Sequence, residues 1–336
     1  MDKKIQIARP GGIDQLRVSA DAPADPGPGE IRVRHEAIGV SFIDIYHRTG
    51  LYPLPLPSTL GVEGAGVVEA TGPGVTRLSP GDRVAYAGAP VGAYASTRLL
   101  PETRAIVLPD DIPANAAAAS MLRGITAHML LTLIFPVGPG TTALIHAAAG
   151  GTGALLSRWA KYLGATVIGT TSSMEKAELA RQAGADHVIV GRDADLIGEV
   201  RNLTEGRGVD VAYDGIGGGM LARTLACVRP FGTVASIGQA AGPIPALNLE
   251  DIGPRRSLSL ARPSFMAYAA DLSTYRTAAA AVMDSLFQTV DESELAVIRS
   301  FRRPWGRIVD GWLQTEPSGP FAGVRRLHYH SWPGPR

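Results

Sequence analysis

The fold of this chain is decided by the stretch Thr142-Ala-Leu-Ile-His-Ala-Ala-Ala-Gly-Gly-Thr-Gly153, which runs into a helical segment at 154–163. A short apolar strand that enters a glycine turn and then a helix is typical of the opening of a dinucleotide-binding βαβ unit. Glycine lets the backbone approach a pyrophosphate, and the helix directs N–H groups and a partial positive charge at it. We therefore expect the turn to bind an anion. The G-x-G-x-x-G spacing is met only by Ala148, Gly150 and Gly153, so a plain glycine-rich turn is the alternative.

Strand-like and helix-like segments alternate after this turn. We expect strands at 166–169, 187–190, 209–213 and 233–237, and helices at 174–183, 193–203 and 218–228. Glycines 184, 206 and 208 should end two of these helices. This alternation predicts an α/β fold with a parallel, doubly wound sheet whose ligand lies at the carboxyl ends of the strands.

The end of the second strand indicates which dinucleotide is preferred. An NAD-binding unit usually has Asp or Glu there, about 20 residues after the glycines, to hold the ribose 2′-hydroxyl. Here the chain reads Gly169-Thr-Thr-Ser-Ser-Met-Glu-Lys176, without a carboxylate at the tip. The hydroxyls of Ser172 and Ser173 and the ammonium of Lys176 suit a 2′-phosphate instead, so we expect NADPH. Alternatively, one of the two serines caps the next helix and Lys176 is an ordinary solvated side chain.

Composition describes an ordinary globular protein of about two domains. Of its 336 residues 45% are apolar, and the net charge of +1 gives no global attraction to nucleic acid or to an anionic membrane. The start, Met1-Asp-Lys-Lys4, lacks the apolar core of a signal peptide, and apolar runs such as Met129-Leu-Leu are too short to span a bilayer. We therefore expect a cytoplasmic location. The single cysteine, Cys227, excludes an intramolecular disulfide, and its position favours a buried structural thiol.

Residues 1 to about 124 differ from the middle of the chain. Proline and glycine are frequent there, and β-type runs occur at 31–34, 66–69 and 83–86. Turns are predicted at Gly72-Pro-Gly74 and Ser79-Pro-Gly-Asp82, since proline fixes φ and glycine supplies positive φ. These features indicate a mostly β domain.

Four segments together carry a family resemblance. They are Gly39-Val-Ser-Phe-Ile-Asp-Ile-Tyr-His-Arg-Thr-Gly-Leu-Tyr-Pro53, Gly61-Val-Glu-Gly-Ala-Gly-Val-Val68, Pro80-Gly-Asp-Arg-Val84 and His146-Ala-Ala-Ala-Gly-Gly-Thr-Gly153. From about residue 5 to Val290 the chain resembles the zeta-crystallin-type NADPH:quinone oxidoreductases, zinc-free members of the medium-chain dehydrogenase/reductase superfamily. The resemblance implies a GroES-like, mostly β catalytic domain built from both ends of the chain, a Rossmann domain between them, and a homodimer. We expect the catalytic domain at 1–124, the Rossmann domain at 125–258 and the return to the catalytic domain at 259–290.

We predict no metal site. A catalytic zinc needs Cys or His ligands and an open coordination position. Where zinc members of the superfamily have a ligand cysteine this chain has Gly39-Val-Ser41, and where they have Gly-His-Glu it has Gly61-Val-Glu63. Glu63 is expected to pair inside the catalytic domain. The scattered histidines 35, 47 and 128 lack clustered partners and are more readily satisfied or exposed side chains than ligands.

Without a metal, the expected reaction is hydride transfer from NADPH to an electrophile activated by conjugation, such as a quinone. Tyr46 and Tyr52 match the family's substrate-cleft tyrosines, and Ser41 stands where the family commonly has asparagine, so these three are the expected catalytic residues. The tyrosines either contact a planar quinone or only pack a loop. Two other functions stay open: an enoyl or alkenal reductase on the same scaffold, and a catalytically weak NADPH-binding structural or RNA-binding protein.

The resemblance also implies a set of cofactor-binding residues. They are Ala149, Gly150, Gly151, Thr152, Gly153, Thr170, Ser172, Ser173, Lys176, Arg192, Gly238 and Gln239. Two departures from the family lie at or beside these residues. Gln239 stands where the family commonly has asparagine, and Gly191, next to Arg192, stands where it has tyrosine. Losing the tyrosine removes one face for the adenine, although Arg192 beside it could stack there instead. We therefore expect weaker cofactor binding.

The chain departs from the family entirely after Val290. Residues 291–336 hold three of its four tryptophans and seven arginines but no lysine, and they lack the strands and helix with which the family returns to the catalytic domain. We expect an atypical tail whose tryptophans, Trp305, Trp312 and Trp332, are partly exposed. The alternative is a diverged but packed terminus.

Overall fold

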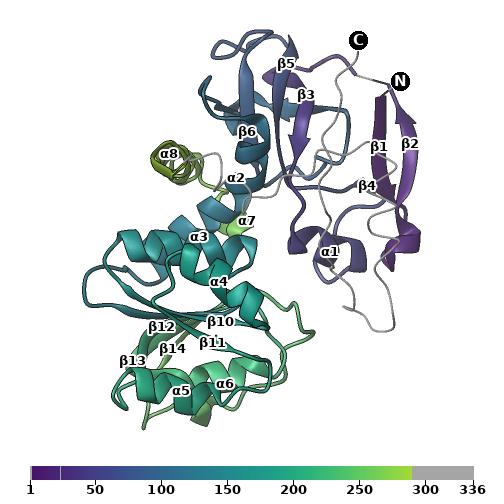
Figure 1. The fold of residues 1–336 in the computed structure, drawn as a ribbon. Helices are drawn as coiled ribbons and strands as arrows, with labels where there is room; N and C mark the ends of the chain where they lie inside the picture. Colours follow the sequence, from purple (N-terminus) through teal and green to yellow (C-terminus); the bar gives the residue numbers. More distant parts are fainter. Residues whose placement is uncertain (1, 23, 290–336) are drawn as a thin grey trace. The chain divides into compact units, whose positions relative to one another are not determined.

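The computed structural model describes residues 2–22 and 24–289, with side chains described as far as Asp284. By their contacts these residues form two compact units (Figure 1): one comprises the chain up to Leu122 and the residues from Ala269 onward, and the other is Arg123–Tyr268. The expectations for the tail at 291–336 lie outside the described residues.

The first unit is built on two antiparallel sheets. The larger has the order β7 (Thr97–Pro101), β3 (Glu30–Ile38), β5 (Glu63–Thr71), β6 (Arg83–Ala87) and β8 (Ile106–Val107). The smaller has the order β2 (Arg17–Asp21), β1 (Asp2–Ile7) and β4 (Ser58–Thr59). Strand β3 shows the pattern that specifies such a sheet, because Ile31 and Val33 are buried while Glu30 and Arg32, which alternate with them, are only half-buried. This mostly β architecture agrees with the sequence prediction.

Three helices accompany these sheets: α1 (Phe42–Thr49), the N-terminal part of α2 (Ala114–Met129) and α8 (Leu272–Thr289). Helix α8 is fixed to the unit by Tyr275, whose hydroxyl donates to the carbonyl of Arg104 (3.0 Å) and accepts from the backbone N–H of Ala87 (3.1 Å). The guanidinium of Arg104 lies over the Tyr275 ring, 4.3 Å from its centre. The C-terminal return to the first unit is therefore made by α8.

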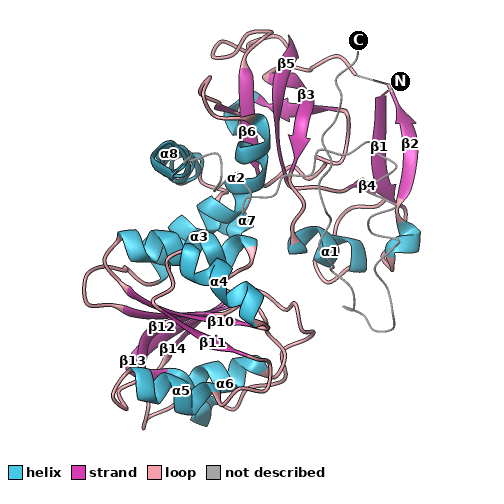
Figure 2. Ribbon diagram, in the orientation of Figure 1, coloured by secondary structure: helices cyan, strands magenta, loops and turns pink. Residues whose placement is uncertain are grey.

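The second unit is a six-stranded, all-parallel sheet with helices on both faces (Figure 2). The strand order is β11 (His187–Val190), β10 (Thr166–Thr171), β9 (Thr142–Ile145), β12 (Val209–Asp214), β13 (Val228–Ser236) and β14 (Ser259–Ala261). The helices are α3 (Gly151–Tyr162), α4 (Met174–Gln182), α5 (Leu196–Leu203), α6 (Met220–Cys227) and the short α7 (Phe265–Tyr268). This is the doubly wound fold that the alternation predicted.

Three boundaries differ from the sequence expectations. Helix α6 begins at Met220 instead of 218 because Gly217 and Gly218 have positive φ. Helix α5 begins at Leu196, capped by the Asp195 side chain, which accepts the N–H of Gly198 at 3.1 Å. The return to the first unit falls at Ala269 instead of 259, because β14 continues the parallel sheet beside β13.

Helix α2 is the most apolar long helix among the described residues. Contrary to the expectation from short apolar runs, α2 continues through the π-helical turn Leu130–Ile134, so Ala114–Ile134 is long and apolar enough to span a membrane. However, 67% of its most apolar window is buried inside the structure. Core helices of soluble proteins pass the same length and composition test, so this one helix is weak support for a membrane span.

Candidate active site

The turn between β9 and α3 has the geometry of an anion site. Helix α3 begins at Gly151 after the extended Gly150, which has no side chain to cap it, and its first turn carries no acidic residue. The first helical hydrogen bond joins the Ala154 N–H to the Gly150 carbonyl at 2.7 Å, so the N–H groups of residues 151–153 precede the helical ladder. A Cβ on Gly153 would lie 2.3 Å from the Ala147 carbonyl oxygen, so only glycine fits there. These features match what a pyrophosphate requires of a helix N-terminus.

A network of hydrogen bonds around the buried His146 supports this turn. The Thr224 hydroxyl donates to the Met220 carbonyl (2.9 Å), so it must accept from His146 Nε2–H (2.8 Å). His146 Nδ1 then accepts from the Thr170 hydroxyl (3.0 Å), and that oxygen accepts the N–H of Ala147 (3.3 Å). Burial lowers the pKa of His146 to about 4, against the opposing charge of Asp214. The neutral ring thus holds Ala147, whose φ is 51°, in its left-handed conformation.

The residues expected at the 2′-phosphate lie just after β10. The ammonium of Lys176 donates to the Ser172 hydroxyl at 3.3 Å, and both side chains are exposed. Ser173 is the N-cap of α4 and accepts the Lys176 N–H at 3.4 Å. The capping alternative therefore holds for Ser173, whereas Ser172 and Lys176 form an exposed polar pair, with the exposed Glu175 next to Lys176 in the chain.

The remaining expected cofactor residues follow the other strands of the sheet. Arg192 follows β11 and is exposed, and the guanidinium of Arg223 donates to its carbonyl at 3.2 Å. Gly238 and the buried Gln239 follow β13, and a Cβ on Gly238 would lie 2.6 Å from the Gly215 carbonyl oxygen. The tertiary structure thus gathers the expected residues at the carboxyl edge of the parallel sheet, where β9 and β12 form the topological switch point.

Ser41 and Glu63 form a buried polar contact in the first unit. The Ser41 hydroxyl donates to Glu63 Oε1 (3.2 Å), and the Leu122 N–H donates to Glu63 Oε2 (2.8 Å). Glu63 is completely buried, and a Cβ on Gly39 would lie 2.3 Å from its Cγ. The expectation that Glu63 pairs inside its own domain is therefore confirmed. Ser41 is held at the start of α1 by this carboxylate.

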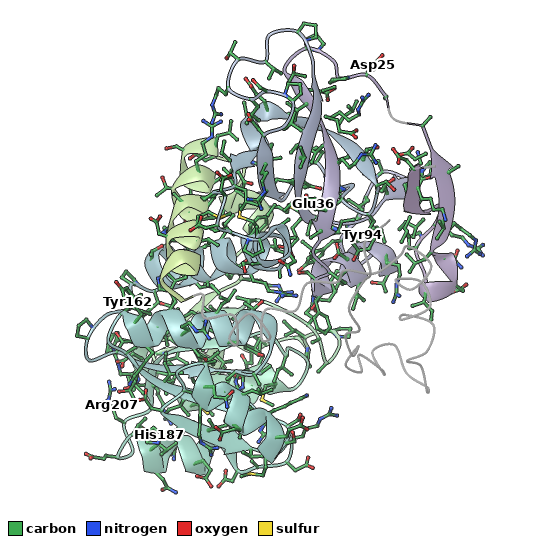
Figure 3. The ribbon with its side chains drawn as sticks, turned by 45° about the horizontal axis from the view of Figure 1, so that its top comes forward. Asp25, Glu36, Tyr94, Tyr162, His187 and Arg207 are labelled. Atoms are coloured by element: carbon green, nitrogen blue, oxygen red, sulfur yellow. The ribbon has the colours of Figure 1, made fainter. Side chains whose placement is uncertain are left out.

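The expected substrate tyrosines contact each other at α1 and the loop that follows it. The rings of Tyr46 and Tyr52 meet edge to face with centres 5.2 Å apart. Tyr46 is buried, whereas Tyr52 is half-buried and Phe42, 6.4 Å from Tyr46, is exposed. Tyr94, labelled in Figure 3, donates from its hydroxyl to Oδ2 of the buried Asp44 at 3.0 Å. This bond ties α1 to the chain between β6 and β7.

The three scattered histidines do not converge. His35 is half-buried, donates from Nδ1 to the Ala95 carbonyl (2.7 Å) and accepts from the Tyr86 hydroxyl (2.6 Å) at Nε2. His47 is buried beside Tyr52, and burial lowers its pKa. His128 pairs with the Tyr268 hydroxyl at 3.0 Å. Within 2–22 and 24–284, no group of three or more His, Cys, Asp or Glu side chains is placed to hold a metal ion.

Sequence reasoning missed several residues of this region. Thr170 was expected at the cofactor, but its hydroxyl is turned toward His146, which the sequence did not single out as a site residue. His146 lies inside the glycine motif itself, which is the signal that could have found it. Arg223 follows no recognisable spacing. Asp214 lies in the segment 213–217, and its Oδ1 accepts the N–H groups of Ile216 (2.8 Å) and Gly217 (3.1 Å) at the end of β12.

Comparison with known proteins gives consistent matches along the chain. Residues 27–110 match the alcohol dehydrogenase GroES-like domain, and residues 151–283 match the family described as zinc-binding dehydrogenase. The chain is 44% identical to a quinone oxidoreductase of Pseudomonas aeruginosa, over 88% of this chain and 90% of that protein. It is 42% identical to a 2-haloacrylate reductase of a Burkholderia species, over 86% of this chain and 89% of that protein.

A solved structure extends the similarity to three dimensions. The quinone oxidoreductase of Escherichia coli, crystallised in complex with NADPH, superposes with a TM-score of 0.79 at 36% identity. The match covers 94% of this chain and 90% of that one. Both the fold and its division into a GroES-like and a Rossmann part are therefore shared with a protein that binds NADPH.

Proposed function

Because this chain belongs to the quinone oxidoreductases of the medium-chain dehydrogenase/reductase superfamily, we propose that it reduces quinones with NADPH as the hydride donor. The observation that carries the proposal is the turn at Gly150–Gly153. It combines an uncapped helix N-terminus with the absence of any acid in the first turn of α3, at the switch point of the sheet.

The NADPH assignment rests on residues at both phosphate positions. The α3 N-terminus suits the pyrophosphate, and the exposed Ser172 and Lys176 suit the 2′-phosphate. Ser173 already caps α4 through its oxygen, and its hydroxyl hydrogen can still donate to a phosphate. The residues present therefore fit NADPH, and the E. coli relative of known structure was solved with that cofactor.

The proposed roles in the first unit concern the substrate. Bound NADPH would supply a hydride from its nicotinamide ring to the conjugated acceptor. Tyr52, half-buried and supported edge to face by the buried Tyr46, is the better placed of the two tyrosines to contact a planar quinone. Ser41 donates to Glu63 and forms a capping box with Asp44, so its hydroxyl is held in place at the start of α1. These residues position the substrate and keep water away from it.

We also propose that the protein works without zinc, in the cytoplasm, and as a homodimer. Ser41 and Val62 stand where zinc members of the superfamily have ligands, and neither supplies a thiolate or an imidazole. The homodimer is supported by β14, which among the described residues pairs with β13 alone and so presents an edge of the parallel sheet to a second copy. Light scattering of the purified protein tests the oligomeric state.

NADPH consumption by the purified protein tests the main proposal. Turnover is measured by absorbance with a panel of benzoquinones, naphthoquinones and phenanthrenequinone, and with NADH in place of NADPH as the paired comparison. We expect quinone-dependent oxidation of NADPH that is faster than that of NADH. Tight NADPH binding without turnover on any acceptor would instead favour a structural role.

A second candidate function has its own support. The 42% identity to a 2-haloacrylate reductase makes reduction of an activated carbon–carbon double bond the alternative on the same scaffold. Adding 2-chloroacrylate, a simple enone and a simple enal to the acceptor panel separates the two. A kcat/KM for 2-chloroacrylate above that for every quinone would favour the second candidate.

A further inference from the structure

The ring of His146 joins three elements of the second unit. His146 directly follows β9, and its two nitrogens bind the hydroxyls of Thr170 on β10 (3.0 Å) and of Thr224 on α6 (2.8 Å). His146 and Thr224 are both buried, so the contact between them lies inside the unit. A residue of α6 is thereby linked to the segment that carries the glycine turn.

The hydrogen bonds through this ring run in one direction. The hydroxyl hydrogen of Thr224 is used on the Met220 carbonyl, so the ring carries its proton on Nε2 and accepts at Nδ1. Thr170 donates its hydrogen to Nδ1, and its oxygen accepts the N–H of Ala147 at 3.3 Å. The tautomer that Thr224 selects therefore decides where the hydrogen of the Thr170 hydroxyl points.

Ala147 passes this constraint to the glycines of the turn. Its carbonyl oxygen accepts the Gly150 N–H at 2.7 Å and lies 2.3 Å from the place of a Cβ on Gly153. Its φ of 51° is unfavourable for alanine, so neighbouring contacts must hold it. The next N–H, that of Ala148, donates to the Thr170 carbonyl at 3.0 Å. Thr170 thus fixes the turn through both its hydroxyl and its carbonyl.

We propose that His146 and Thr224 are positioning residues for cofactor binding. They orient the Thr170 hydroxyl, which holds Ala147 and the glycine turn in the conformation that receives the diphosphate of the dinucleotide. Both side chains are buried, so they act through Thr170 and not by contact with the cofactor. The inference rests on the proposed function and extends its machinery to α6, outside the glycine motif.

The substitution Thr224→Val removes the hydroxyl and keeps the shape of the side chain. The buried Nε2–H then has no acceptor, which favours the tautomer with the proton on Nδ1. That proton points at the Thr170 oxygen, so the Thr170 hydrogen must turn to another acceptor and the position of Ala147 changes. Thr224→Ser keeps the hydroxyl and is the conservative comparison.

Thr204 provides a matched control in the same unit. Its hydroxyl also donates to the carbonyl four residues earlier, that of Val200 (2.7 Å), and also accepts a hydrogen bond, from the Gly208 N–H (2.9 Å). Thr204 precedes β12 and lies at the amino edge of the sheet, whereas the glycine turn lies at the carboxyl edge. Thr204→Val therefore removes the same groups from a place that does not support the turn.

The test compares ligands that contain the diphosphate with one that lacks it. Dissociation constants for NADPH, NADH, ADP-ribose and 2′-AMP are measured by titration. We expect Thr224→Val and His146→Gln to weaken the three diphosphate ligands by a common factor of about 3 to 10, as for a lost neutral hydrogen bond. Binding of 2′-AMP should be unchanged, Thr224→Ser should retain most of the affinity, and Thr204→Val should match the unmodified protein.

A double-mutant cycle tests whether Thr224 acts through the ring. If it does, Thr224→Val should weaken ADP-ribose little further once His146→Gln is present, because the two residues form one pathway. Independent, additive losses would show that Thr224 does not act through His146.

The tautomer is measured on the unmodified protein, which keeps the test valid even if a variant fails to fold. Long-range ¹H–¹⁵N correlation spectra at pH 7.5 distinguish the two neutral forms of histidine, and the signal that His146→Gln lacks identifies this ring. We expect the proton on Nε2, and its transfer to Nδ1 in Thr224→Val. A proton on Nδ1 in the unmodified protein would overturn the inference.

Unchanged affinity for NADPH and ADP-ribose in Thr224→Val would also overturn it. An equal loss for 2′-AMP, or an equal loss in Thr204→Val, would do the same, because each indicates a general effect on the fold. If the unmodified protein binds none of the three diphosphate ligands, the proposed function itself fails. The two failures are therefore distinguishable.

Discussion

Lowering the pH should destabilise this protein through two histidines, the half-buried His35 in the first unit and the buried His146 in the second. Burial lowers the pKa of each ring to about 4, and nearby Arg98 adds to the effect at His35. In the unfolded chain a histidine titrates near its ordinary value of 6.5. At a pH between the folded and the unfolded pKa, the histidine is protonated in the unfolded chain but neutral in the folded protein. The free energy of unfolding therefore falls as the pH falls.

The magnitude follows from the gap between the two pKa values. At 1.36 kcal/mol per pH unit, protonation of one such histidine lowers the free energy of unfolding by about 3 kcal/mol at pH 4. The full stabilisation by the neutral ring is present only above pH 6.5. His146 is buried, so solvent screening does not reduce its figure much, whereas His35 is half-buried and its loss should be smaller. Two such losses are comparable with the whole stability of a domain, which is about 5–15 kcal/mol.

Urea unfolding followed by circular dichroism at pH 7.5, 6.5, 5.5 and 4.5 measures the effect. His35→Gln and His146→Gln should be less stable than the unmodified protein at pH 7.5, because their hydrogen bonds are disturbed, and should approach it as the pH falls. His187→Gln, at an exposed position, is the control. If the His35 and His146 variants lose stability between pH 7 and 5 as steeply as the unmodified protein, the argument from buried neutral histidines is refuted.

Other substitutions and treatments test the site. Lys176→Ala should weaken NADPH about 10- to 100-fold while sparing NADH, because one charge-assisted contact to phosphate is lost; equal affinity of the unmodified protein for both cofactors would contradict the assignment. Ala147→Gly should raise the free energy of unfolding by about 0.5–1 kcal/mol, since a φ of 51° strains alanine but not glycine, and a lower urea midpoint would count against this. Burial raises the pKa of Cys227 to about 11, so iodoacetamide at pH 8 should label it only after denaturation, as mass spectrometry would show. Chelators and added zinc should leave turnover unchanged, and stoichiometric zinc whose removal abolishes activity would refute the zinc-free proposal.

The sequence predicts the elements of the second unit well because their signals are local. The apolar runs, the glycines that end helices and the alternation of strand and helix all act over a few residues. The start of α6 differs from the predicted one for a reason that is also local. The positive φ angles of Gly217 and Gly218 delay the helix, and only the structure shows these angles. The tyrosine pair could be predicted for the same reason, because one motif segment contains both residues, whereas the absence of zinc stays a prediction.

What the sequence by itself determined is therefore the parallel, doubly wound sheet, the glycine turn after its first strand and the absence of a carboxylate at the tip of the second. What only the tertiary structure decided is which distant side chains meet at that turn. Thr170 faces His146, and Thr224 closes the other side of the ring. The physical reason is that backbone propensities and caps act between chain neighbours, whereas these contacts join residues on different strands and helices. Such residues come together only when the packed sheet places the ends of its elements at one edge.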